Sequence, residues 1–465
     1  MIYIWVVVFS ILLTSCESGG TESTSSPSYN LPMISLERVD NPNMPELNHM
    51  NIAQYNGYWL IIGGSTSGFH SFSGSKANNN IYVYNPTTQA LYFESIGNTN
   101  LPESVQQQIV SLAPMPLQDG DTFYLVGGYY NESASFFKYT TLDTISSFNV
   151  PGMINAIMNN NESLAMYVHS SSNSNFKSTG GELGQIGSDF YLSFGQDCEG
   201  LYCITSETYT NSVIKFSTTP SLESINIEGI LYRAEGAYSG FRRRDYTLVP
   251  FIESNIDVLL ALGGPFTAGL PPKVWTNVIS INGDLSYNNN FLNQQANQYR
   301  NGFLSMHSVA TGYSYLATFS GISTLYWDES GNLNYNANAP FGNILELISY
   351  DGNSHASREY ANLTPLCVYK SDGSCVYVGA DADFVPVNDN NIFDNRGILN
   401  MDAITKKTLV GYLYGGIVAD TQSVFFTGGS NASNYIFAVY VTPPSINGTW
   451  KDITNMESGT PFIPD

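Results

Sequence analysis

The sequence is poor in positive charge. Its 465 residues include 17 Lys and Arg against 39 Asp and Glu, which gives a formal net charge of −22 at pH 7. Proteins that bind nucleic acid usually present a basic face to the phosphate backbone. The composition therefore argues against a nucleic-acid partner.

The helix-forming residues Lys, Glu and Arg are also scarce, whereas Tyr, Phe, Thr, Ser, Asn and Gly are plentiful. Aromatic and β-branched residues favour strands, and Gly and Asn favour the turns between them. The composition therefore predicts an all-β protein.

Several motifs of catalysis and cofactor binding are missing. The sequence has no glycine-rich phosphate loop and no GxSxG, HExxH or CxxC motif, each of which marks a particular chemistry. We therefore predict neither a cofactor nor a metal ion.

The chain begins with an apolar run from Ile2 to Leu13. This run is too short to span a bilayer as a helix and fits the core of a signal peptide. It ends in Leu13-Thr14-Ser15-Cys16, which resembles the lipobox of bacterial lipoproteins, although no Lys or Arg precedes the run. The resemblance implies cleavage before Cys16, a lipid on its thiol, and a membrane anchor in the bacterial cell envelope, in the outer membrane. An ordinary secretory signal with an incidental Cys is the alternative.

Three segments follow from this interpretation. Residues 1–15 are predicted to be the signal peptide. Residues 16–29, rich in Ser, Gly and Thr, are predicted to be a flexible tether. Residues 30–465 are predicted to be the folded domain.

The other four cysteines form two closely spaced pairs, Cys198 with Cys203 and Cys367 with Cys375. The first pair would close a short loop, and the second flanks a Ser-Asp-Gly turn across which the thiols could face each other. Two disulfides fit an oxidising compartment. A four-cysteine zinc site is the alternative, but neither spacing resembles CxxC and no histidine lies near the cysteines in the sequence.

One pattern recurs along the domain: a polar turn, an apolar strand and a stop of small residues, at intervals of roughly 50 to 70 residues. Together with flanking strand candidates, each unit would hold four short antiparallel strands, which is the pattern of a propeller blade. The sequence therefore predicts seven four-stranded antiparallel blades. The seven stretches are GYWLIIGG, DTFYLVGG, SDFYLSFG, IDVLLALGG, YSYLATFSG, SCVYVGA and SVFFTGG, which end at Gly64, Gly128, Gly195, Gly264, Gly321, Ala380 and Gly429.

At the glycine doublets these units resemble the kelch repeat, in which the second strand ends in Gly-Gly and the third carries a Tyr. The resemblance covers nearly all of the chain after the tether and implies a kelch-like β-propeller. It is weaker at Phe194-Gly195, Ser320-Gly321 and Gly379-Ala380, where the doublet is incomplete. We expect glycine at these stops because neighbouring blades crowd the chain there.

The chain also resembles an uncharacterised group of bacterial kelch-type proteins at three segments, and that resemblance implies no particular activity. The segments are Arg243-Arg244-Asp245, FSGIS from Phe319 to Ser323 and GADADF from Gly379 to Phe384.

Closure of the ring of blades has two candidates. Either LPMISLERVD near the start or GTWKDITNM near the end could complete the last blade. Both would protect the edge of its sheet.

The stretch FRRRDY precedes the first strand of the predicted fourth blade, and REYANLTP, from Arg358, precedes that of the sixth. The loops entering first strands and leaving second strands emerge on one face, where propellers hold ligands. Arg243, Arg244, Asp245 and Arg358 are therefore predicted ligand-binding residues, because a guanidinium offers a planar fork to a carboxylate or to sugar hydroxyls. The alternative is that these residues pair with neighbouring carboxylates and lock the blades together.

Other candidates are single residues. Glu182 enters the third blade as a candidate acid or base, and His307 lies in the predicted first strand of the fifth. His49 has a comparable position before the first strand of the first blade, and His70 lies in the long loop of that blade. A hydrogen-bonded surface or interblade histidine is the alternative for each. Two further acids, Asp381 and Asp383, offer oxygen ligands for calcium, but their spacing fails the EF-hand pattern and we interpret them as loop caps.

Together these features predict an envelope-anchored lipoprotein whose propeller is a binding module for a carbohydrate or protein ligand. Tyr- and Asn-rich loops suit sugars, because aromatic rings stack on sugar faces and amides pair with hydroxyls. One alternative is an enzyme acting on an acidic sugar, similar to the kelch-type sialic-acid mutarotases, in which Glu182 or a histidine moves a proton. A structural scaffold of the envelope is the other.

Overall fold

The structure, a computed structural model, describes residues 30–69, 76–132, 138–160, 163–200, 207–233, 240–265, 267, 273–422, 429–446, 449–454 and 456. Within these residues the protein is all-β, as the composition predicts. Short antiparallel strands dominate, and α1 (Glu103–Ile109) and α2 (Val150–Asn159) pack against the first two sheets. Short 3-10 helices cover Ile96–Asn98, Leu164–Tyr167, Ser174–Phe176 and Met401–Ala403.

Six sheets each contain four antiparallel strands in simple order, and the fifth has one extra strand at each edge. The first sheet contains β2 (Asn51–Tyr55), β3 (Tyr58–Ile62), β4 (Asn80–Tyr84) and β5 (Leu91–Ser95). The second contains β6 (Met115–Asp119), β7 (Thr122–Val126), β10 (Thr144–Asn149) and β11 (Val168–Ser172). The third contains β12 (Glu182–Ile186), β13 (Asp189–Ser193), β16 (Ser212–Thr218) and β17 (Ile225–Tyr232).

The remaining sheets follow the same plan. The fourth contains β18 (Thr247–Glu253), β19 (Ile256–Leu262), β20 (Asn277–Asn282) and β21 (Tyr287–Asn293). The fifth contains β22 (Phe303–His307), β23 (Tyr313–Phe319), β26 (Leu345–Asp351) and β27 (Ala356–Asn362), flanked by β31 (Leu399–Asn400) and β36 (Trp450–Asp452). The sixth contains β30 (Asp383–Pro386), β32 (Thr408–Tyr414), β35 (Ile436–Ile446) and β1 (Asn30–Val39).

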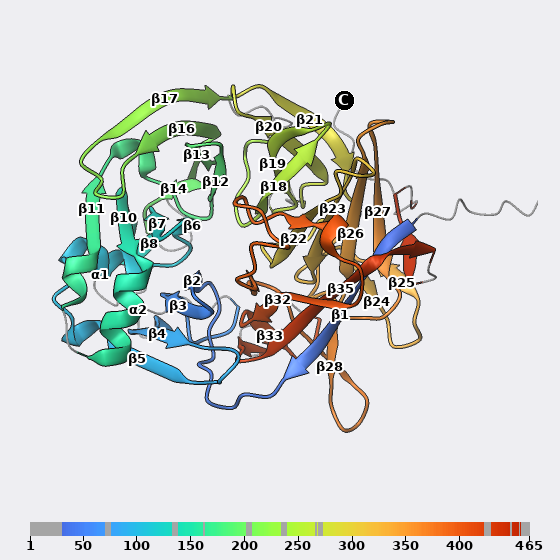
Figure 1. Cartoon of the computed structure of the whole chain (residues 1–465), viewed down its shortest axis with the longest axis horizontal. Coiled ribbons are helices and arrows are strands. Elements are labelled where there is room, and N and C mark those ends of the chain that lie inside the picture. The colour runs from blue at the N-terminus through green and yellow to red at the C-terminus, as the bar shows by residue number, and fades with distance from the viewer. Residues whose placement is uncertain are drawn as a thin grey trace, which may run out of the picture.

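The first strands of these sheets lie toward the middle of the molecule, and the fourth strands lie toward its rim (Figure 1). Each first strand contacts the next in the order β2, β6, β12, β18, β22, β30, and β30 contacts β2. Apolar clusters fill the spaces between adjacent sheets, including the space between the sixth and the first, where Trp59, Tyr84 and Tyr414 are buried. The second strands are therefore buried on both faces, which explains why they read as continuous apolar runs.

Six such sheets follow one another among the described residues, where the sequence predicts seven, and a further four-stranded sheet stands outside this succession. The difference lies in the sixth unit, where SCVYVGA was predicted to be a second strand. Its residues form β29 (Cys375–Tyr377), which pairs with β28 (Cys367–Tyr369) in a small separate sheet with β33 (Ile417–Ala419) and β34 (Ser430–Ala432). The true second strand is β32, which ends at the overlooked doublet Gly415-Gly416. Most of SVFFTGG, the predicted seventh stretch, lies outside the described residues.

One of the two closure candidates completes the last sheet. β1 pairs antiparallel with β35 from Asn30 opposite Ile446 to Val39 opposite Ile436. The other candidate, β36, pairs instead with β27 at the edge of the fifth sheet. The segment near the start of the chain therefore protects the sixth sheet, as the first alternative predicts.

The stops after the second strands require unusual backbone, as predicted. Both residues have positive φ in all six sheets, including Phe194 at +52° and Ser320 at +59° where the doublet is incomplete. At Gly127 an added Cβ would lie 2.1 Å from the carbonyl oxygen of Ser178, in the loop that enters the next sheet, which is closer than any real contact. Adjacent sheets are thus packed backbone to backbone at these turns, and only glycine fits the closest of them.

Short hairpins extend from several of these turns. They are β8 (Tyr129–Asn131) with β9 (Tyr139–Thr141), β14 (Gln196–Cys198) with β15 (Glu207–Tyr209), and β24 (Leu325–Trp327) with β25 (Leu333–Tyr335). Each begins directly after, or a few residues after, the stop of a second strand. These hairpins therefore project from the same face on which the chain enters the first strands.

The cysteines form disulfides rather than a zinc site. Cys367 and Cys375 are joined across the β28–β29 hairpin, as predicted. Cys198 is also disulfide-bonded, and Cys203, its predicted partner, lies outside the described residues, as do Cys16 and His70.

Candidate functional site

The loops that enter the first strands are joined by backbone hydrogen bonds around the axis. The N–H of Gly180 donates to the carbonyl of Ala113 (3.3 Å), that of Asp245 to Gly180 (2.8 Å), that of Arg300 to Asp245 (3.2 Å) and that of Asp381 to Arg300 (2.9 Å). Each bond links one sheet to the next. These residues, with His49 before the first sheet, are called the axial ring.

Five of the six ring residues stand two positions before a first strand and have left-handed backbone. Their φ values are +50° at His49, +46° at Ala113, +65° at Gly180, +48° at Asp245 and +54° at Asp381. Non-glycine residues seldom adopt this conformation, although Asn, Asp and His do so more readily than most. The strain recurs at one place in successive sheets, so it belongs to the architecture of the axis.

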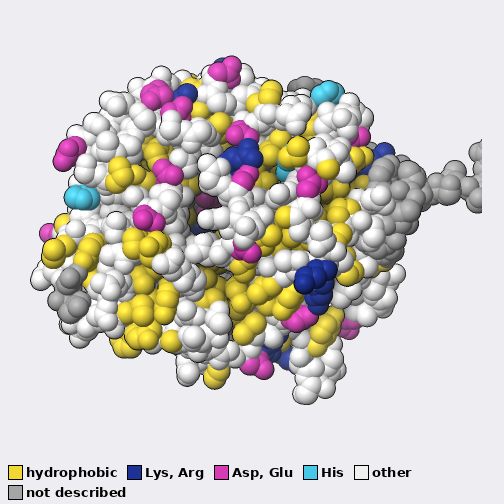
Figure 2. All heavy atoms as spheres, viewed as in Figure 1, with side chains coloured by type: hydrophobic (Ala, Val, Ile, Leu, Met, Phe, Trp, Pro, Cys, Tyr) yellow, Lys and Arg dark blue, Asp and Glu magenta, His cyan; other side chains and the backbone are white. Residues whose placement is uncertain are grey.

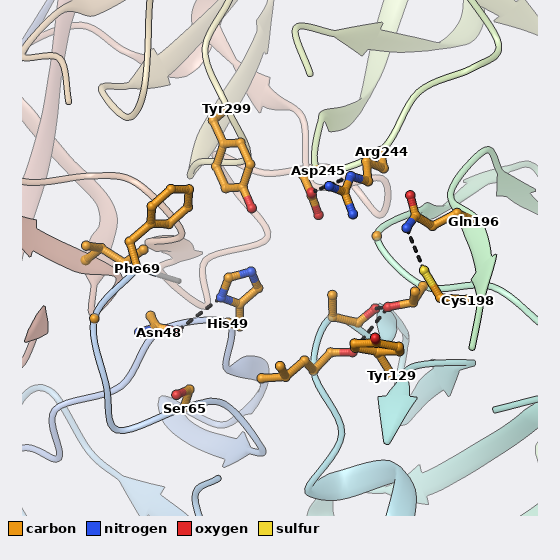
Figure 3. Close-up of a pocket in the computed structure, with 16 residues that line it drawn as sticks. Asn48, His49, Ser65, Phe69, Tyr129, Gln196, Cys198, Arg244, Asp245 and Tyr299 are labelled. Atoms are coloured by element: carbon orange, nitrogen blue, oxygen red, sulfur yellow. Dashed lines mark hydrogen bonds and ion pairs between the residues drawn. The ribbon is translucent and has the colours of Figure 1, made fainter. Parts of the chain in front are cut away.

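A cavity of about 110 Å³ opens beside this ring. Entering loops contribute Asn48, His49, Leu112, Ala113, Thr179, Gly180, Arg244, Asp245 and Tyr299, and segments that leave second strands contribute Ser65, Gly68, Phe69, Tyr129, Gln196, Cys198 and Ile417. The two kinds of loop thus share one face, as predicted. Figure 3 shows Phe69, Asn48 and His49 on one side, facing Tyr129, Gln196 and Cys198 on the other.

The axial ring is asymmetric in its side chains. Ala113 and Gly180 contribute a methyl group and no side chain, whereas the other four sheets present His or charged residues. The space at Gly180 is narrow, since an added Cβ would lie 2.9 Å from Asp245 Oδ1. Figure 2 shows a hollow near the middle of this face, with acidic and basic side chains at its depth.

Arg244 and Asp245 form an ion pair at the wall of the cavity, with Arg244 Nε 3.4 Å from Asp245 Oδ2. Their side chains are 13% and 16% exposed. Burial raises the pKa of Asp245, and Arg244, Arg300 and a hydrogen bond from Tyr299 oppose that rise. The pair can therefore present both charges to one ligand.

Arg300 lies among carboxylates from two other sheets. Its Nε is 3.5 Å from Glu182 Oε1, and Asp383 and Asp381 are close enough to interact electrostatically. Burial raises the pKa of Glu182 to about 7 and that of Asp383 to about 6, although Arg300 lowers both. Around neutral pH these carboxyl groups therefore sit near their titration points, which is the usual condition of an acid–base group.

His49 faces Asp381 across the junction of the first and sixth sheets. Its Nδ1 is 3.2 Å from Asp381 Oδ2 and 3.0 Å from Asn48 Oδ1. Burial, with Arg300, lowers the pKa of His49 to about 3, so the ring is neutral. Figure 3 shows its other nitrogen directed toward the cavity, where it can accept a hydrogen bond.

The structure separates the predicted arginines. Arg244 reaches the cavity, but Arg243 is fully buried and donates to the carbonyls of Ala261 in β19 (2.9 Å) and Asn277 in β20 (2.8 Å). Burial lowers the pKa of the Arg243 guanidinium to about 9. Its side chain joins strands of the fourth sheet and does not line the cavity.

Arg358 was predicted to precede a first strand, and this placement was wrong. It lies in β27, the fourth strand of the fifth sheet, where Nη1 is 3.2 Å from Asp452 Oδ2 of β36. His307 is the last residue of β22, is buried, and shares a hydrogen bond of 2.9 Å with Ser314 Oγ. The structure therefore brings Arg244, Asp245 and Glu182 together and leaves Arg243, Arg358 and His307 apart from them.

Sequence reasoning missed Arg300, Tyr299 and Phe69, and interpreted Asp381 and Asp383 only as loop caps. A signal for Arg300 exists: it stands just before the first strand of the fifth sheet, as Asp245 stands before that of the fourth. Phe69 and Tyr299 come from loops of variable length, where the repeat gives no guide.

No protein-family model matches the chain, and a search of curated proteins found no match. Over the residues that the structure describes, no helix is long and apolar enough to cross a membrane. Over the same residues, no three His, Cys, Asp or Glu side chains are grouped so that they could hold a metal ion.

Proposed function

We propose that the six sheets are the blades of a kelch-like β-propeller and that its axial cavity binds a carbohydrate. The convergence of aromatic rings, amides and an ion pair in one cavity carries the proposal. Phe69, Tyr129 and Tyr299 offer apolar faces for a sugar ring, and Asn48 and Gln196 offer amides for its hydroxyls. Such a cavity, with a few convergent polar groups, is the usual form of a small-ligand site.

The proposal includes the cellular address that the first residues imply. The chain would be anchored through a lipid on Cys16, with the tether of residues 16–29 before the first strand. Metabolic labelling with a fatty acid tests this part: label on the wild-type chain that disappears in Cys16→Ser supports the anchor, and label on neither form contradicts it.

Filling the cavity tests the binding site. Ala113→Asn adds a side chain at a wall residue whose left-handed backbone Asn tolerates better than most residues. On a glycan array, we expect the wild-type chain to bind a subset of glycans and Ala113→Asn to lose that binding. Ala403→Asn, at an exposed residue outside the cavity, is the control. Circular dichroism shows whether each variant folds.

Equal glycan binding by wild type and Ala113→Asn would place the site elsewhere. Binding to proteins but to no glycan would favour the protein-ligand version of the module. Binding to nothing would favour a structural role in the envelope.

A second candidate function rests on Glu182, whose pKa of about 7 beside Arg300 suits proton transfer. An enzyme of this kind would turn over a sugar with a rate that depends on pH near neutrality, and Glu182→Gln would abolish turnover. Binding that persists without any turnover would contradict it.

A further inference from the structure

The wall of the cavity is close to electrically neutral. Arg244 and Asp245 form an ion pair with 3.4 Å between Nε and Oδ2. Among the residues that line the cavity, the remaining member of the set His, Lys, Arg, Asp and Glu is His49. Burial with Arg300 nearby lowers the pKa of His49, so its ring carries no charge near neutral pH. A ligand in the cavity therefore meets no excess of positive charge at the wall. The sequence instead predicts several arginines that bind a carboxylate or sugar hydroxyls.

Carboxyl groups outnumber guanidinium groups around the wall. Glu182, Asp381 and Asp383 lie close to the single guanidinium of Arg300. Asp381 is part of the axial ring and its side chain is fully buried. Its polar neighbour among the described residues is His49, with Nδ1 3.2 Å from Oδ2, and neither carboxylate oxygen accepts a hydrogen bond of good geometry. Burial raises the pKa of Glu182 to about 7, that of Asp383 to about 6 and that of Asp381 well above its usual range, so these groups hold protons that a cation bound nearby would displace.

Aromatic rings border the same space. Phe69 and Tyr299 meet edge to face at 5.9 Å between ring centres, and Figure 3 shows the Tyr299 ring extending toward the middle of the cavity. Tyr129 stacks on Tyr139 at 4.6 Å on the opposite side, which fixes its orientation. The faces of such rings attract ammonium groups as well as the apolar faces of sugars.

We infer that the cavity selects a sugar that carries an ammonium group, an amino sugar, over neutral and acidic sugars. Asp245, paired with Arg244, is the carboxyl acceptor at the wall, the Nε2 atom of His49 is a neutral acceptor on the same cavity, and the aromatic rings contact the sugar body. This inference rests on the proposed carbohydrate site and adds the charge of its ligand. The absence of a metal-binding group among the described residues favours an organic cation over a metal ion.

Calorimetric titration of the purified full chain with three sugars tests the inference, because glucosamine, glucose and glucuronic acid differ mainly in one charged group. We expect glucosamine to bind at least tenfold more tightly than glucose, and glucuronic acid to bind more weakly than either. Raising the salt concentration should weaken the binding of glucosamine and leave that of glucose nearly unchanged.

Asp245→Asn supplies the matched variant, since Asn keeps the shape of the side chain and tolerates the φ of +48°. We expect it to weaken glucosamine binding at least fivefold and to change glucose binding less than twofold. The control is Asp257→Asn, which removes a half-exposed carboxylate that pairs with Arg396 and does not line the cavity. It should leave all three affinities unchanged.

The outcomes separate the inference from the proposed function. If glucose or glucuronic acid binds as tightly as glucosamine and Ala113→Asn still abolishes binding, the site is real and its preference for a cation is overturned. If Ala113→Asn leaves binding unchanged, or no sugar binds to the folded chain, both fail. The salt dependence decides the question of charge even if Asp245→Asn does not fold.

Discussion

Two regions of the molecule bury carboxylates, and they do so in opposite ways. In the fifth sheet, Glu346 of β26 and Glu359 of β27 are fully buried and hydrogen-bonded to each other. Near the axis, Glu182, Asp381 and Asp383 surround Arg300 beside a cavity. The first region has no guanidinium among the partners described for it, and the second has one for three carboxyl groups.

The difference lies in where the hydrogen bonds go. Glu359 accepts from the backbone N–H groups of Gln295 (2.6 Å) and Ala296 (2.7 Å), and Glu346 accepts from Gln294 Nε2 (2.9 Å) and Thr318 Oγ1 (2.6 Å). Burial and the neighbouring carboxyl group raise the pKa of Glu359 well above its usual range, so the pair shares a proton. This region fastens a loop to a sheet, whereas near the axis neither carboxylate oxygen of Asp381 accepts a hydrogen bond of good geometry.

Removing Arg300 should have the largest effect on stability. We expect Arg300→Met to lower the free energy of unfolding by about 4 kcal/mol at pH 8, because buried carboxylates lose their counter-charge. The loss should shrink at pH 5, where Glu182 and Asp383, with pKa values of about 7 and 6, are protonated. Denaturant unfolding at both pH values measures this, and an equal loss at pH 5 and pH 8 would show that Arg300 acts by packing alone.

Glu359→Ala should follow, with a loss of about 3 kcal/mol. The reason is that two backbone N–H groups at Gln295 and Ala296 lose their acceptor inside the protein. Glu228→Ala, which removes a partly exposed carboxylate near Lys215, is the control and should change stability little. A loss below 1 kcal/mol for Glu359→Ala would mean that water replaces the carboxylate, and the contrast between the two regions would weaken.

Glu182→Gln should change the pH dependence of stability. The folded pKa of about 7 exceeds the ordinary value of 4.5, so the folded state holds the proton more tightly than the unfolded chain. This contribution is complete below about pH 4.5 and is lost as the pH rises to 7, a fall of up to roughly 3 kcal/mol. Unfolding measured from pH 4.5 to 8 should therefore give a flatter curve for Glu182→Gln than for wild type, and parallel curves would contradict the assignment.

Arg358→Ala should have the smallest effect. Its ion pair with Asp452 joins two partly exposed side chains at the rim of the fifth sheet, and such pairs contribute about 0.5 kcal/mol. We expect a change of that size in unfolding and no change in glucosamine affinity. A loss of sugar binding would instead support the prediction that Arg358 binds the ligand, although it lies in the fourth strand of its sheet.

Much of the fold could be predicted from the sequence because its strongest signals are local. The stop after each second strand needs positive φ and room for a neighbouring backbone, so glycine marks it, and five of the six second strands were placed correctly. The sixth was missed because Gly379-Ala380 was chosen over Gly415-Gly416. The β28–β29 hairpin lies between the fifth and sixth sheets, and β31 is inserted between the first two strands of the sixth, so the spacing of the repeat is interrupted there.

The candidate site was only partly predictable, since its members come from different sheets. Arg244, Asp245 and Glu182 stand beside strand starts that the repeat identifies, and they were found. Arg300 meets Glu182 across more than a hundred residues of chain, and no local pattern of the sequence records that contact. Arg243 and Arg244 are adjacent just before a first strand, yet one side chain points into the fourth sheet and the other points to the cavity. A run of three arginines in the sequence does not reveal which of them points in which direction.

The pairing of β1 with β35 has a mechanical consequence. β1 is the first strand that the structure describes, and it lies antiparallel to β35 along its length. A force applied to the chain ahead of residue 30, as the proposed lipid anchor would apply it, would act along the axis of this strand, so that its hydrogen bonds share the force in shear rather than opening one after another. The strength of the pairing between β1 and β35 would then set the force at which β1 detaches from the sixth sheet.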